Sequence, residues 1–378
     1  MIENINDELV FRFPEIEATL HSEITAWLDR RIAQASPIEI DKIGIREKFL
    51  SGLLERHGKV QACVSFQRTL RIPDDGKEYP LPPGLGNLPL RHIEDFVSTP
   101  TSWRATGGVM LPMHRGEAMW LRFSGRGYPM ILRVASGKVC AVSGLKWESG
   151  LSDNPQNYVV IHDQPWLDGF RIGKDLIRQF VAVPIGKGLT VESQISGREG
   201  WGGIQLQAYP LKAEVFLEVI HWVLEADWER SVDPLSRQTY GPCFVRSISA
   251  AGNMGLGAGG KIRQRIYRDS RDITEWDTSI SSRCFVRLCL ADDWQRLTGT
   301  PCPHEPPTAE AYTNAGLPWF DYENPVAVLA GQTALSGVNS VDHLLKDKTG
   351  FGIPDNAPLE STNVIKLKRS TPQVVSEF

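Results

Sequence analysis

The chain has 378 residues, of which 41 are Lys or Arg and 45 are Asp or Glu, giving a formal net charge of −4. With 41% hydrophobic and 23% charged residues, the composition excludes a wholly disordered chain, a collagen-like fibre and a long coiled coil. The mild acidity also argues against nucleic acid as a partner, because binding through counterion release needs a basic surface. The length suggests two to three packing units.

The sequence predicts a soluble, cytoplasmic protein. No stretch reaches the roughly 20 apolar residues that a membrane-spanning helix needs. The acidic start, Met1 to Glu8, lacks the basic and apolar regions of a signal peptide. The six cysteines form no C-x-x-C pair, so we interpret five of them as small, buried, reduced thiols: Cys63, Cys140, Cys243, Cys284 and Cys289.

The first 60 residues predict a helical segment. Residues 14–34 place apolar side chains at helical spacing, and Pro14 suits a first helical turn. A second helix is predicted over 45–57, where Gly58 provides a C-terminal cap.

Residues 61–104 predict a strand followed by an extended linker. The alternating pattern of 60–72 is typical of a β-strand and ends at the turn Pro73-Asp-Asp-Gly76. Residues 79–89 contain too many prolines and glycines for regular structure. We expect this linker to pack against the protein's own surface, and a proline-rich ligand for an aromatic groove is the alternative.

Residues 105–211 predict a β-rich central domain. Short segments of β-forming residues alternate with turn residues, which favours a sandwich over a parallel sheet with crossover helices. The predicted strands are 118–123, 129–134, 138–142, 158–161, 177–183 and 203–209. The expected fold class is therefore α+β, with a β-sandwich-like, mainly antiparallel central domain flanked by helices.

Residues 212–346 predict a mixed α/β region packed on that domain, and 347–378 lose periodicity and predict a loosely ordered tail. The mixed region holds helix candidates at 212–230, 292–298 and 308–315 and strand candidates at 243–248 and 283–289.

A glycine-rich stretch suggests a phosphate or nucleotide site. Gly255, Gly257 and Gly260 satisfy G-x-G-x-x-G, the pattern that exposes backbone amides to a pyrophosphate. The neighbouring cations that would assist are Lys261, Arg263 and Arg265. No apolar second strand ending in an acidic residue follows, and Ile262 replaces the hydroxyl residue of a phosphate loop. A tightly turned glycine loop without a ligand is the alternative.

A His/carboxylate set suggests a metal or acid–base site in the β-rich region. It comprises His114, Glu117, His162, Asp163 and Asp168, which lie near predicted strand ends and would meet at one rim. No H-x-H or H-x-x-x-H spacing is present. The alternative is that His162, Asp163 and Asp168 stabilise turns around Pro165-Trp166.

Nucleophile motifs are absent from the sequence. There is no G-x-S-x-G, and Cys302 is the only cysteine with a close histidine, His304, in a proline-rich loop. Because neighbouring loop residues rarely form the pair that thiol catalysis requires, we do not predict a catalytic thiol here.

Five blocks resemble an uncharacterised family of bacterial and fungal proteins, some of which are labelled "integral membrane protein". The blocks are 67–77, 79–86, 163–169, 177–182 and 316–321, and the resemblance covers most of residues 65–322. It implies no catalytic role for any residue.

Together these patterns favour a non-enzymatic binding or assembly protein, with a protein partner or a homo-oligomer as its assembly. The expected contact residues lie in the Trp-, Pro- and Gly-rich loops: Tyr79, Leu85 and Trp166. The alternatives are a metal-dependent hydrolase using the His/carboxylate set, and phosphate or nucleotide binding at 252–265. The sequence leaves any cofactor open.

Overall fold

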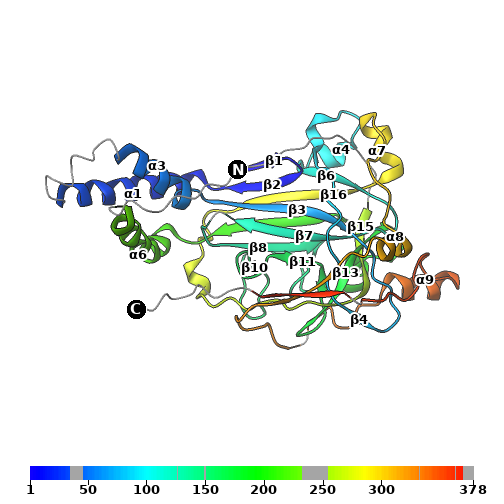
Figure 1. Cartoon of the computed structure of the whole chain (residues 1–378). Helices are drawn as coiled ribbons and strands as arrows, with labels where there is room; N and C mark the ends of the chain where they lie inside the picture. Colours follow the sequence, from blue (N-terminus) through cyan, green and yellow to red (C-terminus); the bar gives the residue numbers. More distant parts are fainter. Residues whose placement is uncertain are drawn as a thin grey trace.

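The computed structural model describes residues 1–34, 46–125, 127–148, 150–231, 254–331, 333–361 and 363–368. Its centre is one large, mostly antiparallel sheet of 16 strands, with helices gathered at both ends (Figure 1). This confirms the α+β class. The predicted strand 243–248, and Cys243 with it, lie outside the described residues.

The first half of the sheet consists of five neighbouring antiparallel strands. In spatial order these are β1 (Ile2–Ile5), β2 (Glu8–Arg12), β3 (Gln61–Thr69), β7 (Ala118–Gly125) and β13 (Leu176–Pro184). Both β3 and β7 alternate apolar and polar residues, as half-buried strands do.

The second half continues from β13 through five further antiparallel strands. They are β15 (Met254–Arg263), β16 (Ser282–Leu290), β14 (Ile204–Pro210), β8 (Met130–Ser136) and β10 (Val159–Val160). Shorter strands pair alongside this path: β4 (Glu78–Tyr79), β5 (Arg91–His92), β6 (Val109–Met113), β9 (Val139–Cys140), β11 (Trp166–Leu167) and β12 (Gly169–Arg171).

The sheet is continuous, which differs from the expected sandwich of two separate sheets. Strand β15 joins the halves because it pairs with both β13 and β16. The sheet nevertheless curls, since the Ser282 hydroxyl of β16 donates at 3.4 Å to the carbonyl of Met1, the residue before β1. One apolar core therefore takes side chains from both halves, among them Phe66, Leu121, Leu132 and Val286.

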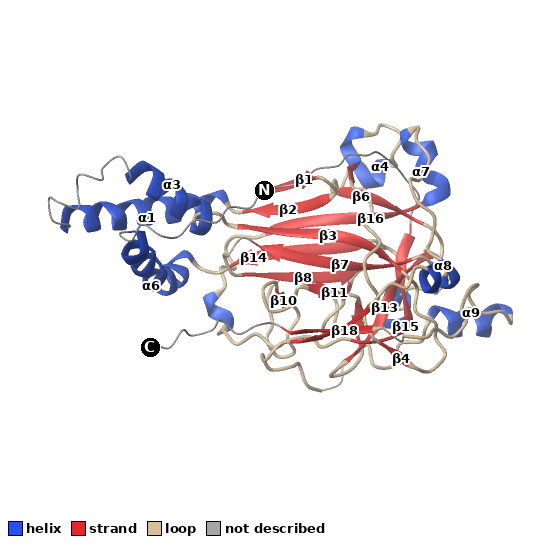
Figure 2. Cartoon of the chain, in the orientation of Figure 1, coloured by secondary structure: helices blue, strands red, loops and turns tan. Residues whose placement is uncertain are grey.

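Three helices lie together at one end of the sheet (Figure 2). They are α1 (Pro14–Gln34), α3 (Arg46–His57) and α6 (Ala213–Ser231), close to their predicted ranges. The Trp27 indole on α1 donates to Glu225 of α6 at 3.0 Å. The apolar stripe predicted for α1 packs into the core through Leu20, Ile24 and Leu28.

The remaining helices are short, and several gather at the opposite end (Figure 2). At that end lie α4 (Thr101–Arg104), α7 (Ala291–Thr298), α8 (Ala309–Asn314) and α9 (Val341–Thr349), while α5 (Val191–Ser196) follows β13 in the chain. The described residues also include two 3-10 turns, at Ile93–Asp95 and Ile273–Glu275. None of the described helices is long and apolar enough to cross a membrane.

The described part of the C-terminal segment runs along the body of the protein. Strand β18 (Val364–Lys368) pairs in parallel with β17 (Trp319–Glu323) in a second, two-stranded sheet. Before it, the Leu359 amide donates to the Tyr79 hydroxyl at 3.3 Å. Residues 347–368 of the expected tail thus include the end of α9, these contacts and one strand.

Candidate metal centre

The turn between β6 and β7 brings His114 next to Glu117. The Glu117 amide donates to the His114 carbonyl at 3.1 Å, and Gly116 takes a positive φ of 78° inside this turn. Glycine suits that position because it has no Cβ to clash. The Glu117 carboxylate in turn accepts the His114 amide at 2.8 Å. The tight turn thus fixes both side chains at the end of a central strand.

The loop between α7 and α8 brings Cys302 next to His304. Four of the seven residues 301–307 are proline, which restricts the backbone and disfavours helix at the preceding residues. In an extended segment, residues two apart point to the same side. The Cys302 Sγ lies 3.7 Å from the His304 Nδ1.

The turn and the loop meet, so that His114, Cys302 and His304 form one cluster. Each offers a ligand atom, and the three atoms lie within 4.8 Å of one another. The His114 Nε2 is 2.9 Å from the His304 carbonyl oxygen, and the two rings meet edge to face with centroids 5.7 Å apart. Two imidazoles and a thiol at this spacing are a ligand set that zinc prefers.

Glu117 orients His304 from the other side of the ring. Its Oε1 lies 3.2 Å from the His304 Nε2, and both side chains are almost completely buried. When Nε2 carries the imidazole proton, it donates a hydrogen bond to the carboxylate. Nδ1 is then unprotonated and can accept on the Cys302 side. A carboxylate behind a histidine is the usual support of a metal ligand. Arg68, whose Nε is 3.8 Å from Glu117 Oε1, offsets the buried charge.

Burial raises the pKa of the Cys302 thiol to about 11, with Glu117 and Glu305 acting in the same direction and the backbone of His304 opposing them. The thiol is therefore protonated at neutral pH. A bound metal ion would displace that proton, because thiolate is the form that binds metals.

A cavity of about 420 Å³ lies beside Glu117, the partner of His304, although His114, Cys302 and His304 themselves do not line it. Glu117 lies in its wall, together with Gly116 of the turn and Glu305 of the proline-rich loop. Arg71 also lines the cavity, as do Pro354 and Asp355 of the segment after α9. The volume falls within the range of small-molecule sites.

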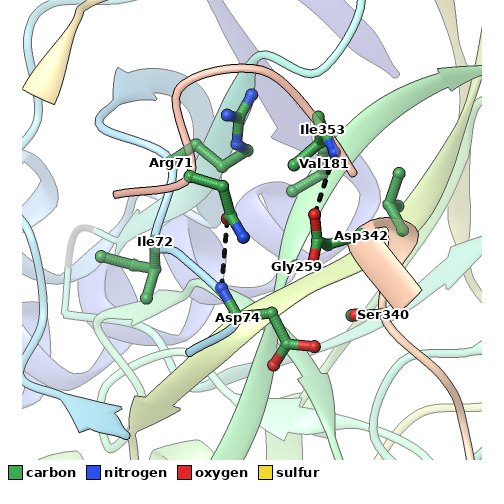
Figure 3. Close-up of a pocket in the computed structure, with 11 residues that line it drawn as sticks. Arg71, Ile72, Asp74, Val181, Gly259, Ser340, Asp342 and Ile353 are labelled. Carbon is green, nitrogen blue, oxygen red and sulfur yellow. Dashed lines mark hydrogen bonds between the residues drawn. The ribbon is translucent and has the colours of Figure 1, made fainter. Parts of the chain in front are cut away.

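Arg71 holds the C-terminal segment against this cavity. Its guanidinium donates to the carbonyls of Gly116, Pro354 and Asp355. A smaller cavity of about 10 Å³ is also lined by Arg71 and by Asp342, which accepts the Ile353 amide at 2.9 Å (Figure 3). Residues 353–355 are thus fixed at two neighbouring points, and they form a defined wall.

The His/carboxylate set predicted from the sequence does not come together. His114 and Glu117 precede β7, whereas His162 lies beside Gly125 at its other end, with its Cε1 3.4 Å from the position of a Cβ on that glycine. Seven residue steps along a strand span roughly 23 Å. Asp163 stays with His162, where its carbonyl accepts the Asn324 side chain at 3.1 Å.

Asp168 is buried away from both histidines. Its carboxyl accepts the Gln264 amide at 2.8 Å, the only side-chain hydrogen bond to this group among the described residues. Burial raises its pKa to about 8, against a smaller opposing effect of Gln264. Asp168 thus links the residue before β12 to Gln264, the residue after β15, and shares no described hydrogen bond with the predicted histidines.

The glycine-rich stretch is strand β15 and not a loop, which corrects the expected conformation. Gly255 and Gly257 pair with Val183 and Val181 of β13, so this backbone forms part of the sheet. A Cβ on Gly257 would lie 2.4 Å from a Val341 methyl, and one on Gly260 would lie 2.3 Å from the Pro73 carbonyl. The glycines allow other segments to cross the strand closely.

The cations that follow these glycines do not gather around unpaired backbone amides. They are Lys261, Arg263 and Arg265. Lys261 pairs with Arg178 of β13 and with Glu78 of β4 in the sheet register, and Arg263 is exposed at the end of β15. Arg265 forms ion pairs with Asp175 at 3.4 Å and Glu323 at 3.5 Å.

The predicted contact residues pack mainly within the protein itself. Tyr79 is 2% exposed, stacks on Trp319, and donates its hydroxyl to Asp75 at 2.7 Å. Trp166 is half-buried against Tyr322, with ring centroids 5.0 Å apart. The Leu85 amide donates to the Arg68 carbonyl at 2.8 Å, and its side chain is partly exposed.

Cys302 and His304 stand out in the sequence as a close cysteine–histidine pair, but their pattern did not predict metal ligands. The informative signal was the alternation of Cys302 and His304 with prolines, which favours an extended backbone and one shared direction for both side chains. The contact with His114, 190 positions away, has no local signal.

Comparison with protein-family models, with curated proteins and with solved structures gives no match to this chain.

Proposed function

We propose that the chain binds a divalent transition metal ion through His114, Cys302 and His304 and uses it for hydrolysis of a small substrate in the adjoining cavity. The observation that carries the proposal is the three ligand atoms within 4.8 Å, backed by a buried carboxylate on one of the histidines. Of the alternatives from the sequence, this geometry supports the metal-dependent enzyme best, although the residues differ from the predicted set.

Zinc fits the ligand set best. Thiolate and imidazole ligands disfavour magnesium and calcium, which prefer oxygen ligands. Structural zinc sites usually have four protein ligands, whereas catalytic sites keep three and leave one position for water. A group of three ligands matches the second arrangement. Zinc lowers the pKa of its bound water to about 7, which supplies a nucleophile at neutral pH.

The same atoms suggest a second candidate, a thiol nucleophile. Cys302, His304 and Glu117 follow the order nucleophile, base and orienting carboxylate that thiol hydrolases use. The raised pKa of Cys302 opposes this, because a thiol nucleophile needs a lowered pKa. A bound metal ion would stabilise the Cys302 thiolate despite its raised pKa. We therefore rank the metal centre first.

Metal content tests the proposal directly. We expect protein purified without added metal or chelator to carry stoichiometric zinc by native mass spectrometry. After replacement by Co²⁺, a near-ultraviolet thiolate-to-cobalt band should appear in the wild type and vanish in Cys302→Ser. His304→Ala should lose most of the metal. His343→Ala is the matched control, because His343 is half-exposed on α9 and pairs only with Asp347 among the described residues.

Hydrolysis is then measured with chromogenic carboxylic and phosphoric esters. Loss of activity on chelation and recovery with zinc would support the metal-dependent reaction. Activity that survives chelation but disappears in Cys302→Ser would establish the thiol candidate instead. A wild type that binds no more zinc or cobalt than His304→Ala would overturn the proposal.

A further inference from the structure

A third cavity, which shares no lining residue with the other two, has a buried arginine in its wall. The cavity measures about 360 Å³ and lies between β8 and the segment 140–157. Arg133 of β8 is only 2% exposed, whereas Lys146 and Glu148 on the rim have side-chain exposures of 76% and 70%. The cavity is therefore buried at Arg133 and exposed to solvent at Lys146 and Glu148.

The Arg133 guanidinium has unused hydrogen-bond donors. Of its five N–H groups, one on Nη1 donates to Gln207 at 3.1 Å and one on Nη2 donates to the Glu148 carbonyl at 2.7 Å. The Nε group is buried without a partner among the described residues. The guanidinium also lies 4.2 Å from the centroid of the Trp147 ring, which holds it in place without neutralising it.

Arg133 is thus a buried cation whose described partners are all neutral, although buried charges are normally paired. Further donors face the same cavity. The Ser143 hydroxyl accepts a hydrogen bond from the Leu145 amide at 3.3 Å, and its own O–H can still donate. Lys146 adds a positive charge, which forms an ion pair with Glu148 at 3.2 Å. A donor-rich cavity over an unneutralised arginine is suited to an anion.

We propose that this cavity binds a small organic oxyanion, a carboxylate or a phosphate monoester, with Arg133 as its principal ligand. The planar fork of arginine matches two oxygens of either group. The volume admits a molecule of several heavy atoms beyond the anionic group. The site is independent of the metal centre and stands whether or not that centre holds zinc.

The test is titration of the full chain with succinate, inorganic phosphate and a sugar phosphate, followed by calorimetry and thermal unfolding. Sodium chloride of equal ionic strength serves as the baseline. We expect saturable binding of at least one oxyanion and a matching rise in Tm. The relative affinities of succinate and the phosphates then identify which source of the oxyanion the cavity prefers.

Two variants decide whether Arg133 is responsible. Arg133→Gln should weaken binding about tenfold or more, since bonds to a charged group are the strong ones. Arg171→Gln is the matched control, because Arg171 is also buried and, among the residues that the structure describes, donates only to the carbonyls of Leu329, Ala330 and Gly331, but it does not line this cavity. It should bind as the wild type does.

If Arg133→Gln does not fold, the rim variant Lys146→Gln combined with Ser143→Ala takes its place and should weaken binding several-fold. The proposal is overturned if no oxyanion stabilises the wild type beyond chloride. It is equally overturned if Arg133→Gln, or the rim variant in its place, binds as tightly as the wild type.

Discussion

Glu117 and Asp168 are carboxyl groups at the same depth with different surroundings. They are 2% and 1% exposed. Glu117 accepts the His114 amide, contacts the His304 ring and faces Arg68. Asp168 receives one side-chain hydrogen bond, from the neutral Gln264. One carboxylate belongs to a charged network beside a cavity, and the other is surrounded by neutral packing.

The contrast shows that burial alone does not make a functional acid. Removing a carboxylate from water is costly unless a cation or several donors compensate. Asp168 has neither and keeps its proton up to a pKa of about 8. A strongly shifted pKa often marks an active site, yet here the shifted group is structural. The partners, rather than the depth, distinguish the two.

Removal of the Glu117 carboxylate should have the largest effect. In chelator-treated protein, Glu117→Ala leaves Arg68 and His304 without their buried partner, and breaking such a network costs about 3–5 kcal/mol. Urea unfolding measures this loss. In metal-loaded protein, the isosteric Glu117→Gln should reduce zinc affinity by roughly 10–100-fold, because the carboxylate orients the ligand.

The control for Glu117 is Glu305→Gln, since the Glu305 side chain is 88% exposed. It should leave stability unchanged. If Glu117→Ala is no less stable than this control, the two buried carboxyls are equivalent and the comparison fails.

Asp168→Asn should act through pH. The folded-state pKa of Asp168 is raised to about 8 from an ordinary value of 3.8, so the folded chain holds a proton that the unfolded chain releases. Its contribution is complete below the unfolded pKa and is lost as pH rises towards 8. Between pH 5 and 7 wild-type stability should therefore fall by about 1.4 kcal/mol per pH unit relative to Asp168→Asn.

Denaturant unfolding of both proteins at several pH values checks this slope. Parallel pH profiles would mean that Asp168 is ionised in the folded state and resembles Glu117 after all.

A third carboxylate, Glu199, should give the smallest effect. Burial would raise its pKa, but hydrogen bonds from Thr190, Gly188 and Gly186 outweigh that effect and lower it. Glu199→Gln should cost about 1–2 kcal/mol at pH 7, where these charged hydrogen bonds exist. Because the folded pKa is lowered, the contribution is present above the ordinary glutamate pKa and is lost as pH falls below it.

Thermal unfolding at pH 7 and at pH 3 tests this prediction, and the difference between wild type and Glu199→Gln should shrink at the lower pH. An equal stability difference at both pH values would show that residues 186–190 depend on the shape of the Glu199 side chain and not on its charge.

Local patterns in the sequence predicted most long strands and the helices α1, α3, α6, α7 and α8, but not α4, α5 or α9. Apolar spacing located α1 and α6, and the glycine after α7 takes the positive φ of a C-terminal cap at Gly299. Strand β15 escaped prediction because its glycines carry no side-chain periodicity, and their purpose is the close approach of Val341 and Pro73 from distant segments.

The site was only half predictable for a related reason. His114 and Glu117 share one turn, which the sequence identified. Their partners Cys302 and His304 come from a loop almost 190 positions later, and only the tertiary fold brings the two together. In the sequence, His114 and His162 both lie near predicted strand ends. The sequence does not show that they lie at opposite ends of β7, so their separation could not be predicted.

The proline-rich loop has a consequence for how metal would enter and leave. Prolines reduce the number of conformations that Cys302 and His304 can adopt before any ion arrives. Little conformational entropy then remains to be lost on binding. Exchange of the ion would leave the backbone in place, so that the apo and metal-bound proteins should share one shape and differ chiefly in the proton on a sulfur atom.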